Sequence, residues 1–134
     1  MPDVGRDMAA IAVDGKPLVL GGYGSTYVPD AGYYRSMHQY DPGADAWTPR
    51  ADMFTPRSNF AVALLGGRVY AVGGGNWDRA LADVASYDPV SDAWAGKTAL
   101  PQGLPWPRAE AVNGRMYVFD TGVTLEYTPA NDIL

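Results

Sequence analysis

The chain has 134 residues, of which 47% are hydrophobic and 19% are charged, a composition typical of a folded globular protein. Its formal net charge of -5 at pH 7 would repel a phosphate backbone or an anionic membrane surface, so neither nucleic acid nor a membrane is an expected partner. The sequence contains no cysteine, which excludes disulfides and thiolate metal sites.

Glycine and proline punctuate the whole chain, with 16 glycines and 11 prolines mixed with nine tyrosines and four tryptophans. This pattern favours short strands joined by tight turns, and no long helix is expected. Residues 1–7 lack a basic region that leads into an apolar one, and no apolar run approaches about 18 residues. We therefore expect neither a signal peptide nor a membrane span, which favours the cytoplasm but leaves the compartment open.

The first predicted unit covers about residues 6–50. Residues 15–22, Gly-Lys-Pro-Leu-Val-Leu-Gly-Gly, predict a strand that ends in a glycine pair. A long connection (23–37) leads to Tyr40-Asp41-Pro42, and Trp47 lies seven residues after the tyrosine. The Asp-Pro pair fits the start of a type I turn, in which the aspartate accepts a backbone hydrogen bond and the proline presets φ.

The second predicted unit covers about residues 55–98 and repeats this order. The apolar run 60–65 predicts an inner strand that is covered on both faces. Gly66-Gly67 fits a two-residue hairpin turn, after which residues 68–72 return antiparallel. At Gly73-Gly74 the missing side chains allow the backbone to pass close to a neighbouring segment.

The same spacing ends the second unit and partly recurs in a third, at about residues 104–134. Tyr87-Asp88-Pro89 and Trp94 each lie 47 residues after their counterparts in the first unit. In the third unit Asp120-Thr121 replaces the glycine pair, and Leu134 stands where the other copies have tryptophan. Pro105 and Pro107 interrupt its first strand, so this copy is expected to be degraded or terminal.

The recurring strand, glycine pair, Tyr-Asp-Pro and tryptophan resemble the kelch repeat over nearly the whole chain. The resemblance implies an all-β fold of kelch-type β-propeller blades with four antiparallel strands each, about three blades in an incomplete ring. Trp47 and Trp94 are then expected to pack between adjacent blades. Propellers usually close with four to eight blades. We therefore expect either a fragment of a longer propeller, which we favour, or a homodimer that completes a six-bladed ring.

The long connections define the candidate binding face. Antiparallel strands reverse direction in turn, so the second connections (23–37 and 75–82) share one face with the links between blades. Their aromatic and arginine side chains are of the kind that dominates binding hot spots, although individual rings could instead pack onto blade edges. The candidate binding residues are Tyr23, Tyr33, Tyr34, Arg35, Asn76, Trp77, Asp78, Arg79, Trp106 and Arg108.

Two classes of function follow from the resemblance. Kelch propellers mostly bind proteins, and Arg50 and Arg57 in the first link add to a basic and aromatic face that would suit an acidic protein or peptide. The alternative is a fragment of a kelch-type enzyme, an isomerase or hydrolase acting on a sugar or sugar acid. A copper radical oxidase is excluded, because His38 is the only histidine and such sites need several imidazoles and a cysteine-linked tyrosine. No catalytic residue, cofactor or metal site is expected.

Overall fold

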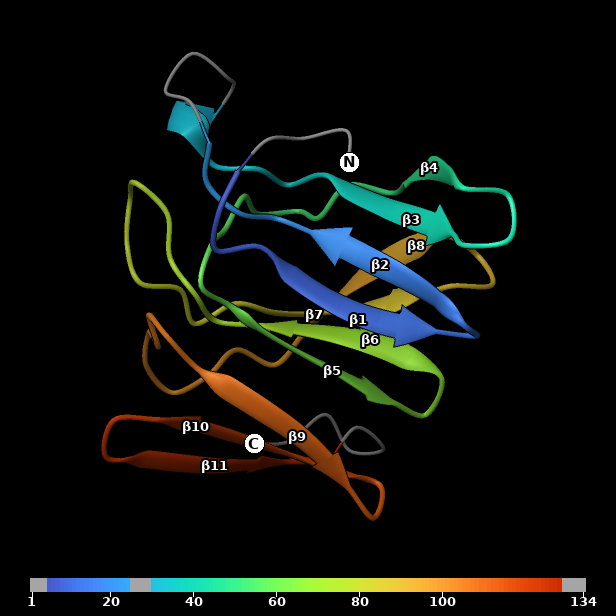
Figure 1. The fold of residues 1–134 in the computed structure, drawn as a ribbon. Coiled ribbons are helices and arrows are strands. Elements are labelled where there is room, and N and C mark those ends of the chain that lie inside the picture. Colours follow the sequence, from blue (N-terminus) through green and yellow to red (C-terminus); the bar gives the residue numbers. More distant parts are fainter. Residues whose placement is uncertain (1–4, 25–29, 129–134) are drawn as a thin grey trace.

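The computed structural model describes residues 5–24 and 30–128, which form three antiparallel sheets (Figure 1). Within this part of the chain there is no α-helix, only a 3-10 turn (η1, Asp30–Gly32), and no helix could span a membrane. The strands are β1 (Ala9–Val13), β2 (Lys16–Leu20), β3 (Met37–Asp41) and β4 (Ala46–Arg50) in the first sheet; β5 (Ala61–Leu65), β6 (Arg68–Val72), β7 (Val84–Asp88) and β8 (Ala93–Lys97) in the second; β9 (Arg108–Val112), β10 (Arg115–Asp120) and β11 (Val123–Tyr127) in the third.

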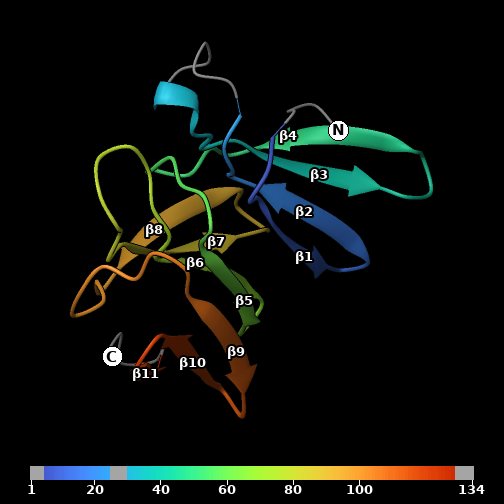
Figure 2. The same cartoon turned by 60° about the vertical axis from the view of Figure 1, so that its left-hand side comes forward.

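The three sheets lie side by side in chain order, with the second sheet between the other two (Figure 2). Each is a meander in chain order, and the first strands are adjacent, because β5 contacts both β1 and β9. The expected open array of about three all-β blades is therefore confirmed. The position of Leu134, expected in a fourth strand of the third blade, lies outside the described residues.

The predicted turns form as expected from their residues. Gly66 and Gly67 have φ values of 60° and 75°, a backbone conformation that glycine adopts without steric cost. They connect β5 to β6, in which Leu65 pairs with Arg68. The Asp41 carboxylate accepts a hydrogen bond from the backbone N–H of Gly43 at 2.9 Å, so this aspartate is a turn former.

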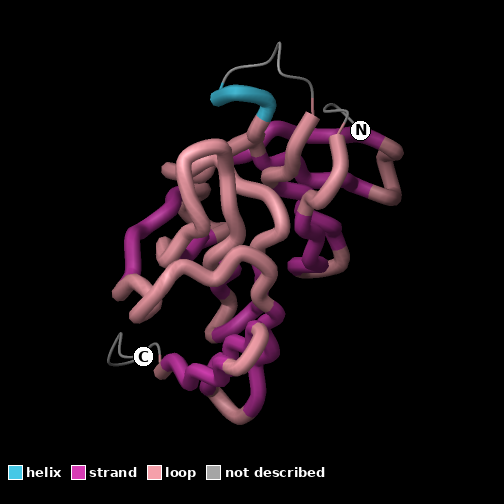
Figure 3. Tube along the Cα trace, turned by 90° about the vertical axis from the view of Figure 1, so that its left-hand side faces the viewer, coloured by secondary structure: helices cyan, strands magenta, loops and turns pink. Residues whose placement is uncertain are grey.

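The second connections differ between the blades. Long loops join β2 to β3 and β6 to β7, and they gather with the links on one side of the molecule (Figure 3). In the third blade, β10 runs to Asp120 and a tight turn at Thr121-Gly122 leads directly into β11. The third blade therefore lacks a long second connection, which agrees with its degraded sequence.

Two apolar clusters fill the joints between neighbouring blades. The cluster between the first and second blades includes Leu18, Met37, Val69 and Trp94, and the cluster between the second and third includes Tyr70, Val72, Met116, Val118 and Tyr127. Trp94 is only 9% exposed, as predicted for a side chain between blades. Trp47, at the same position in the first blade, is half-buried, because no described blade covers that face.

A polar clamp accompanies Trp94 in the first joint. The Arg50 guanidinium donates a hydrogen bond to the Tyr87 hydroxyl at 3.0 Å, and the Tyr87 hydroxyl donates to Asp92 at 2.7 Å. Asp92 also accepts from the Ala51 backbone N–H at 2.9 Å, and the Trp94 indole donates to the Ala51 carbonyl at 3.0 Å. Arg50, expected on the binding face, is instead part of the joint between the blades.

The glycine pairs allow the links to pass close to the sheets. At Gly74, where φ is 85°, a Cβ atom would lie 2.5 Å from the Ser58 carbonyl oxygen, well inside the closest normal contact. The backbone N–H of Gly74 meanwhile donates to the Leu104 carbonyl at 2.8 Å. A close approach of two backbones, as predicted for this pair, therefore requires glycine here.

We predict that Gly74→Ala destabilises the protein far more than Gly66→Ala. Both glycines have positive φ, so each alanine costs about 1 kcal/mol for the left-handed backbone. Only at Gly74 does the new methyl group meet backbone, which should raise the total to about 3 kcal/mol or more. Urea unfolding of both variants measures the difference, and equal losses would contradict this account of the glycine pair.

We also predict that Asp92→Asn removes part of the acid sensitivity of folding. The hydrogen bond from the Tyr87 hydroxyl, then that from the Ala51 N–H, lower the pKa of Asp92 below its ordinary value of 3.8. Its contribution to the free energy of unfolding is therefore complete above about pH 5 and disappears as the pH falls through the lowered pKa. Unfolding curves between pH 3 and 7 should show wild type and Asp92→Asn converging at low pH; a constant difference would contradict this.

Candidate functional site

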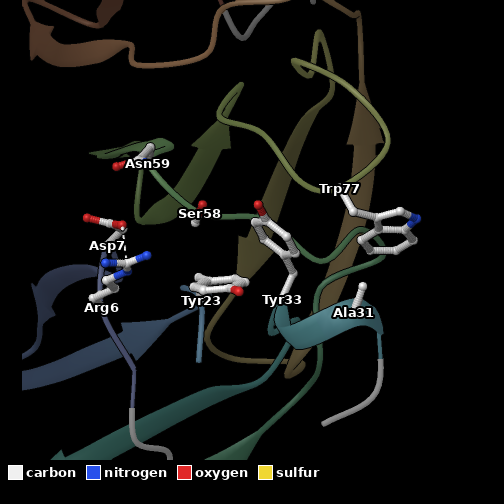
Figure 4. Close-up of a pocket in the computed structure, with 8 residues that line it drawn as sticks. All are labelled: Arg6, Asp7, Tyr23, Ala31, Tyr33, Ser58, Asn59 and Trp77. Carbon is white, nitrogen blue, oxygen red and sulfur yellow. Dashed lines mark ion pairs between the residues drawn. The ribbon is translucent and has the colours of Figure 1, made fainter. Parts of the chain in front are cut away.

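A cavity of about 470 Å³ opens between the first two blades, on the side where the long loops gather (Figure 4). Its walls come from the β2–β3 and β6–β7 loops and from the segments that precede β1 and β5. The residues that line it are Arg6, Asp7, Tyr23, Ala31, Tyr33, Ser58, Asn59 and Trp77. Three of the predicted binding residues, Tyr23, Tyr33 and Trp77, thus come together in one pocket.

Isolated β-bridges hold the pocket walls beyond the ends of the sheets. Arg6 and Tyr23 exchange two backbone hydrogen bonds of 2.9 Å, and Tyr23 also forms a bridge to Tyr33. In the second blade, Ser58 and Gly75 exchange an equivalent pair of 2.9 and 3.0 Å. The loop segments that form the pocket walls are therefore held in place by backbone hydrogen bonds.

An aromatic row crosses the pocket. The ring centroids of Tyr23 and Tyr33 are 4.9 Å apart, and those of Tyr33 and Trp77 are 6.1 Å apart. The Arg6 guanidinium carbon lies 5.3 Å from the centroid of the Tyr23 ring, within range of a cation–π interaction. Since Trp77 is 54% exposed, the row ends in a large ring that is open to a ligand.

Two polar side chains line the opposite wall at corresponding positions of the two blades. Asp7 and Asn59 both have positive φ, 58° and 56°, a conformation that these residue types tolerate well. The Asn59 backbone N–H donates to the Asp7 carbonyl at 3.1 Å, which fixes the two segments beside each other. The pocket consequently offers an aromatic wall and a wall that can form hydrogen bonds.

Asn76 shapes the loop that carries Trp77. Its side-chain amide donates to the Pro56 carbonyl at 2.9 Å, and its carbonyl oxygen accepts from the backbone N–H groups of Asp78 and Arg79 at 3.0 and 3.4 Å. Asn76, which was predicted to contact a ligand, supports the loop that carries Trp77. It also anchors this loop to the link between β4 and β5.

The predicted charged residues of this face are engaged in contacts within the molecule. Arg79 pairs with Asp78 at 2.6 Å and lies 3.7 Å from Asp83. Arg35 donates to the Phe54 carbonyl at 3.2 Å, which braces the first link. The exposed ion pairs contribute little to stability, but they leave this part of the face nearly neutral.

The remaining predicted residues lie outside the pocket. Tyr34 takes part in the backbone contact to the link, where its carbonyl accepts from the Arg57 N–H at 3.2 Å. Trp106 is 64% exposed next to the third blade. Arg108, expected in the link, is the first residue of β9 and pairs with Phe119.

Arg57 is buried instead of facing a ligand. It is 2% exposed, and its guanidinium donates to the carbonyls of Gly73 and Asp83, both at 3.2 Å. Burial lowers the pKa of Arg57 to about 10, and the nearby Asp83 charge opposes this shift. The group therefore stays charged at neutral pH. It borders a second cavity of about 290 Å³, which Asp83 and Lys97 also line.

Five pocket residues escaped the sequence prediction, namely Ala31 and the four polar residues Arg6, Asp7, Ser58 and Asn59. A signal for the four polar residues existed, because Arg6-Asp7 and Ser58-Asn59 are 52 residues apart, as are the strand starts Ala9 and Ala61. In the described ranges no three His, Cys, Asp or Glu side chains cluster as metal ligands would. Asp7 is the only carboxylic acid among the described pocket residues, and the arrangement suits recognition through stacking and hydrogen bonds.

Comparison with known proteins places this fold among repeat proteins. The family model described as Kelch motif matches residues 56–95. Kelch-like protein 26 of Mus musculus is 36% identical over 117 residues, which cover 87% of this chain and 19% of that protein. Kelch-like protein 15 of Danio rerio is 33% identical over 92 residues (67% and 15%), and Kelch repeat and BTB domain-containing protein 13 of Homo sapiens 31% over 101 residues (69% and 21%). The chain spans about a fifth of the length of these relatives.

We predict that Asn76→Ala loosens the Trp77 loop more than Asn76→Asp does, although both variants lose the hydrogen bond to the Pro56 carbonyl. Alanine removes the acceptor for the Asp78 and Arg79 N–H groups, and aspartate keeps it. In hydrogen-exchange experiments, these two amides should exchange about tenfold faster in Asn76→Ala than in Asn76→Asp, since tenfold corresponds to about 1.4 kcal/mol, the size of one hydrogen bond. Equal exchange in the two variants would show that the loop does not depend on this acceptor.

Proposed function

This chain belongs to the kelch-repeat family of β-propeller proteins, and from that premise we propose that it is a protein-binding module whose long-loop face holds an extended segment of a partner. The observation that carries the proposal is the row Arg6–Tyr23–Tyr33–Trp77 across a pocket between two blades. Exposed aromatic and arginine side chains grouped in a concave site are the usual anchors of protein recognition.

The chemistry of the pocket supports a partner segment with an acidic and an apolar side chain. The side chain of Arg6 is 76% exposed, and its contact with Asp7 is long, at 3.8 Å, so a carboxylate of the partner can pair with it at little cost. The open ring of Trp77 suits an apolar or proline side chain at the other end of the row. Asn59 lines the wall opposite the aromatic row, and its side-chain amide can form hydrogen bonds to a peptide backbone.

The remaining predicted residues form the rim of the proposed surface. Arg79, Arg35 and Tyr34 shape the loops around the pocket, while Trp106 and Arg108 extend the surface toward the third blade. A homodimer that completes a six-bladed ring stays a prediction, and so does the alternative of an enzyme acting on a sugar or sugar acid.

We predict that Trp77→Ala and Arg6→Gln weaken peptide binding in different ways. Displayed dodecapeptides provide the ligand, and synthetic copies of the selected sequences, each also made with Asp and Glu replaced by Asn and Gln, serve as probes in fluorescence polarisation. Trp77→Ala should weaken both forms about tenfold or more, since tenfold corresponds to about 1.4 kcal/mol and a hot-spot residue costs about 2 kcal/mol or more. Arg6→Gln should weaken only the acidic form.

Arg115→Gln is the matched control, because Arg115 pairs with Glu126 on the third blade at 3.2 Å and does not line the pocket. Its affinity should equal that of the wild type. Selection of peptides that bind the double variant Trp77→Ala, Arg6→Gln as tightly as the wild type would overturn the assignment of the pocket.

A further inference from the structure

A second cavity, of about 290 Å³, is bounded by the link between β4 and β5, by the start of β7 and by the end of β8. Arg57 lines this cavity, whereas the next residue of the link, Ser58, lines the pocket described above. The two cavities have no lining residue in common. The second cavity is therefore a separate space with its own chemistry.

The guanidinium of Arg57 keeps unused donors in this cavity. Both of its hydrogen bonds, to the carbonyls of Gly73 and Asp83, come from Nη1. Among the described residues the buried Nε has no hydrogen-bond partner, and no carboxylate forms a direct ion pair with Arg57. The N–H groups of Nε and Nη2 thus remain for an acceptor. A buried charge is best compensated by a hydrogen-bonded group of opposite charge.

The link does not need a charged side chain at this position. Leu104 stands at the corresponding position of the second link, 47 residues after Arg57. Its N–H and carbonyl form backbone hydrogen bonds of 3.0 and 2.8 Å to Leu81 and Gly74, the same pattern that Arg57 shows in the first link. One link thus buries a leucine where the other buries a cation, and the backbone contacts form in both.

The space beside Arg57 has apolar walls. Ala85 pairs with Gly96 across β7 and β8, and both line the cavity. A Cβ atom at Gly96 would meet no heavy atom within 4 Å, so the space next to this residue is open. Phe54 also lines the cavity and is 59% exposed. The cavity therefore combines a buried cation with apolar surface, as small-molecule sites commonly do.

The other charged residues of the cavity favour a ligand with a single negative charge. The Asp83 carboxylate lines it as well, and it accepts from the Thr55 hydroxyl at 3.3 Å and lies 3.7 Å from the Arg79 guanidinium. Lys97 is a further lining residue and forms no ion pair within the described ranges. Two cationic residues and one acidic residue thus line the cavity, so a monoanion is attracted, whereas a second negative charge would be repelled by Asp83.

We propose that this cavity binds a small monocarboxylate with an apolar tail. The carboxylate accepts hydrogen bonds from Nε and Nη2 of Arg57, because a planar guanidinium can pair with both carboxylate oxygens. The tail lies along Ala85 and Gly96 and reaches the Phe54 ring. A volume of about 290 Å³ is at the lower end of the range for small-molecule sites, which limits the size of the ligand. This site does not depend on the proposed peptide pocket.

The test uses the whole chain labelled with ¹⁵N, with phenylacetate as the probe and phenylacetamide as its uncharged isostere. Phenylacetate should shift the backbone amide signals of Thr55 and Gly96 and leave that of Tyr23, in the other pocket, unchanged. The dissociation constant should be on the order of 1 mM, because a ligand of about ten non-hydrogen atoms gains only a limited free energy. Phenylacetamide should bind at least about fivefold more weakly, since it offers Arg57 no charge.

Two variants separate the charge from the space. Arg57→Leu should abolish the preference for phenylacetate over phenylacetamide, because it removes the guanidinium and leaves the side chain that the second link has. Gly96→Leu should weaken the binding of both probes at least about tenfold, since the new side chain fills the cavity. Ala95→Leu is the matched control, because Ala95 is an exposed neighbour on β8 that does not line the cavity. Its affinities should equal those of the wild type.

Several results would overturn the proposal. These are the absence of shifts up to about 10 mM phenylacetate, equal binding of phenylacetamide, equal shifts with inorganic phosphate, and an unchanged preference in Arg57→Leu. Shifts confined to Arg6 and Tyr23 would also overturn it, because they would place the carboxylate in the other pocket. Thermal unfolding verifies that each variant is folded. If Arg57→Leu is not folded, Gly96→Leu and the comparison of the two probes decide the question.

Discussion

The blades depend on links whose backbone is hydrogen-bonded to the connection after the second strand of the preceding blade. In the first link, the Arg57 N–H donates to the Tyr34 carbonyl and the Arg57 carbonyl accepts from Gly22. In the second, Leu104 makes the same two bonds with Leu81 and Gly74. Backbones can come this close only where a side chain is missing, and for this reason the glycine pair follows the second strand in both complete units. The spacing of the blades is thereby set by main-chain contacts, to which the apolar clusters then conform.

The same constraint positions the candidate site. The backbone of the link between β4 and β5 is hydrogen-bonded to the β2–β3 loop, and Asn59 is hydrogen-bonded to Asp7. Tyr33 and Trp77, from the two long loops, line the same pocket. Arg57 lies in the interior of this arrangement, where its buried charge is stabilised by the carbonyls of Gly73 and Asp83. Sliding of the link would take this buried charge away from both carbonyls, which is costly in a buried site.

The fold could be predicted because the sequence repeats. The residues of the candidate site could be predicted only in part, because the sequence does not show which segments lie side by side. Gly66-Gly67, Asp41 and Trp94 act locally or recur at a fixed offset, and their roles could be assigned from spacing alone. The loop side chains offered no such rule. Asn76 and Arg79 have the residue types of contact residues, and their side chains make hydrogen bonds and ion pairs within the loop and to the link. Arg57 lies in the interior, because its partners are carbonyls that are far away in the sequence. Arg6 and Asp7 were missed because their role depends on the neighbouring blade.

The two outward faces of the array present different side chains. On the first blade the outward face presents Val19 and the ring pair of Tyr40 and Trp47. On the third blade, the outward residues of β10 and β11 include the Arg115–Glu126 ion pair, whose side chains are 55% and 46% exposed. Covering this pair with an apolar blade would remove both charges from water, a cost that their mutual attraction repays only with good geometry. A ring closed by two copies would therefore have to accommodate this ion pair within its joint.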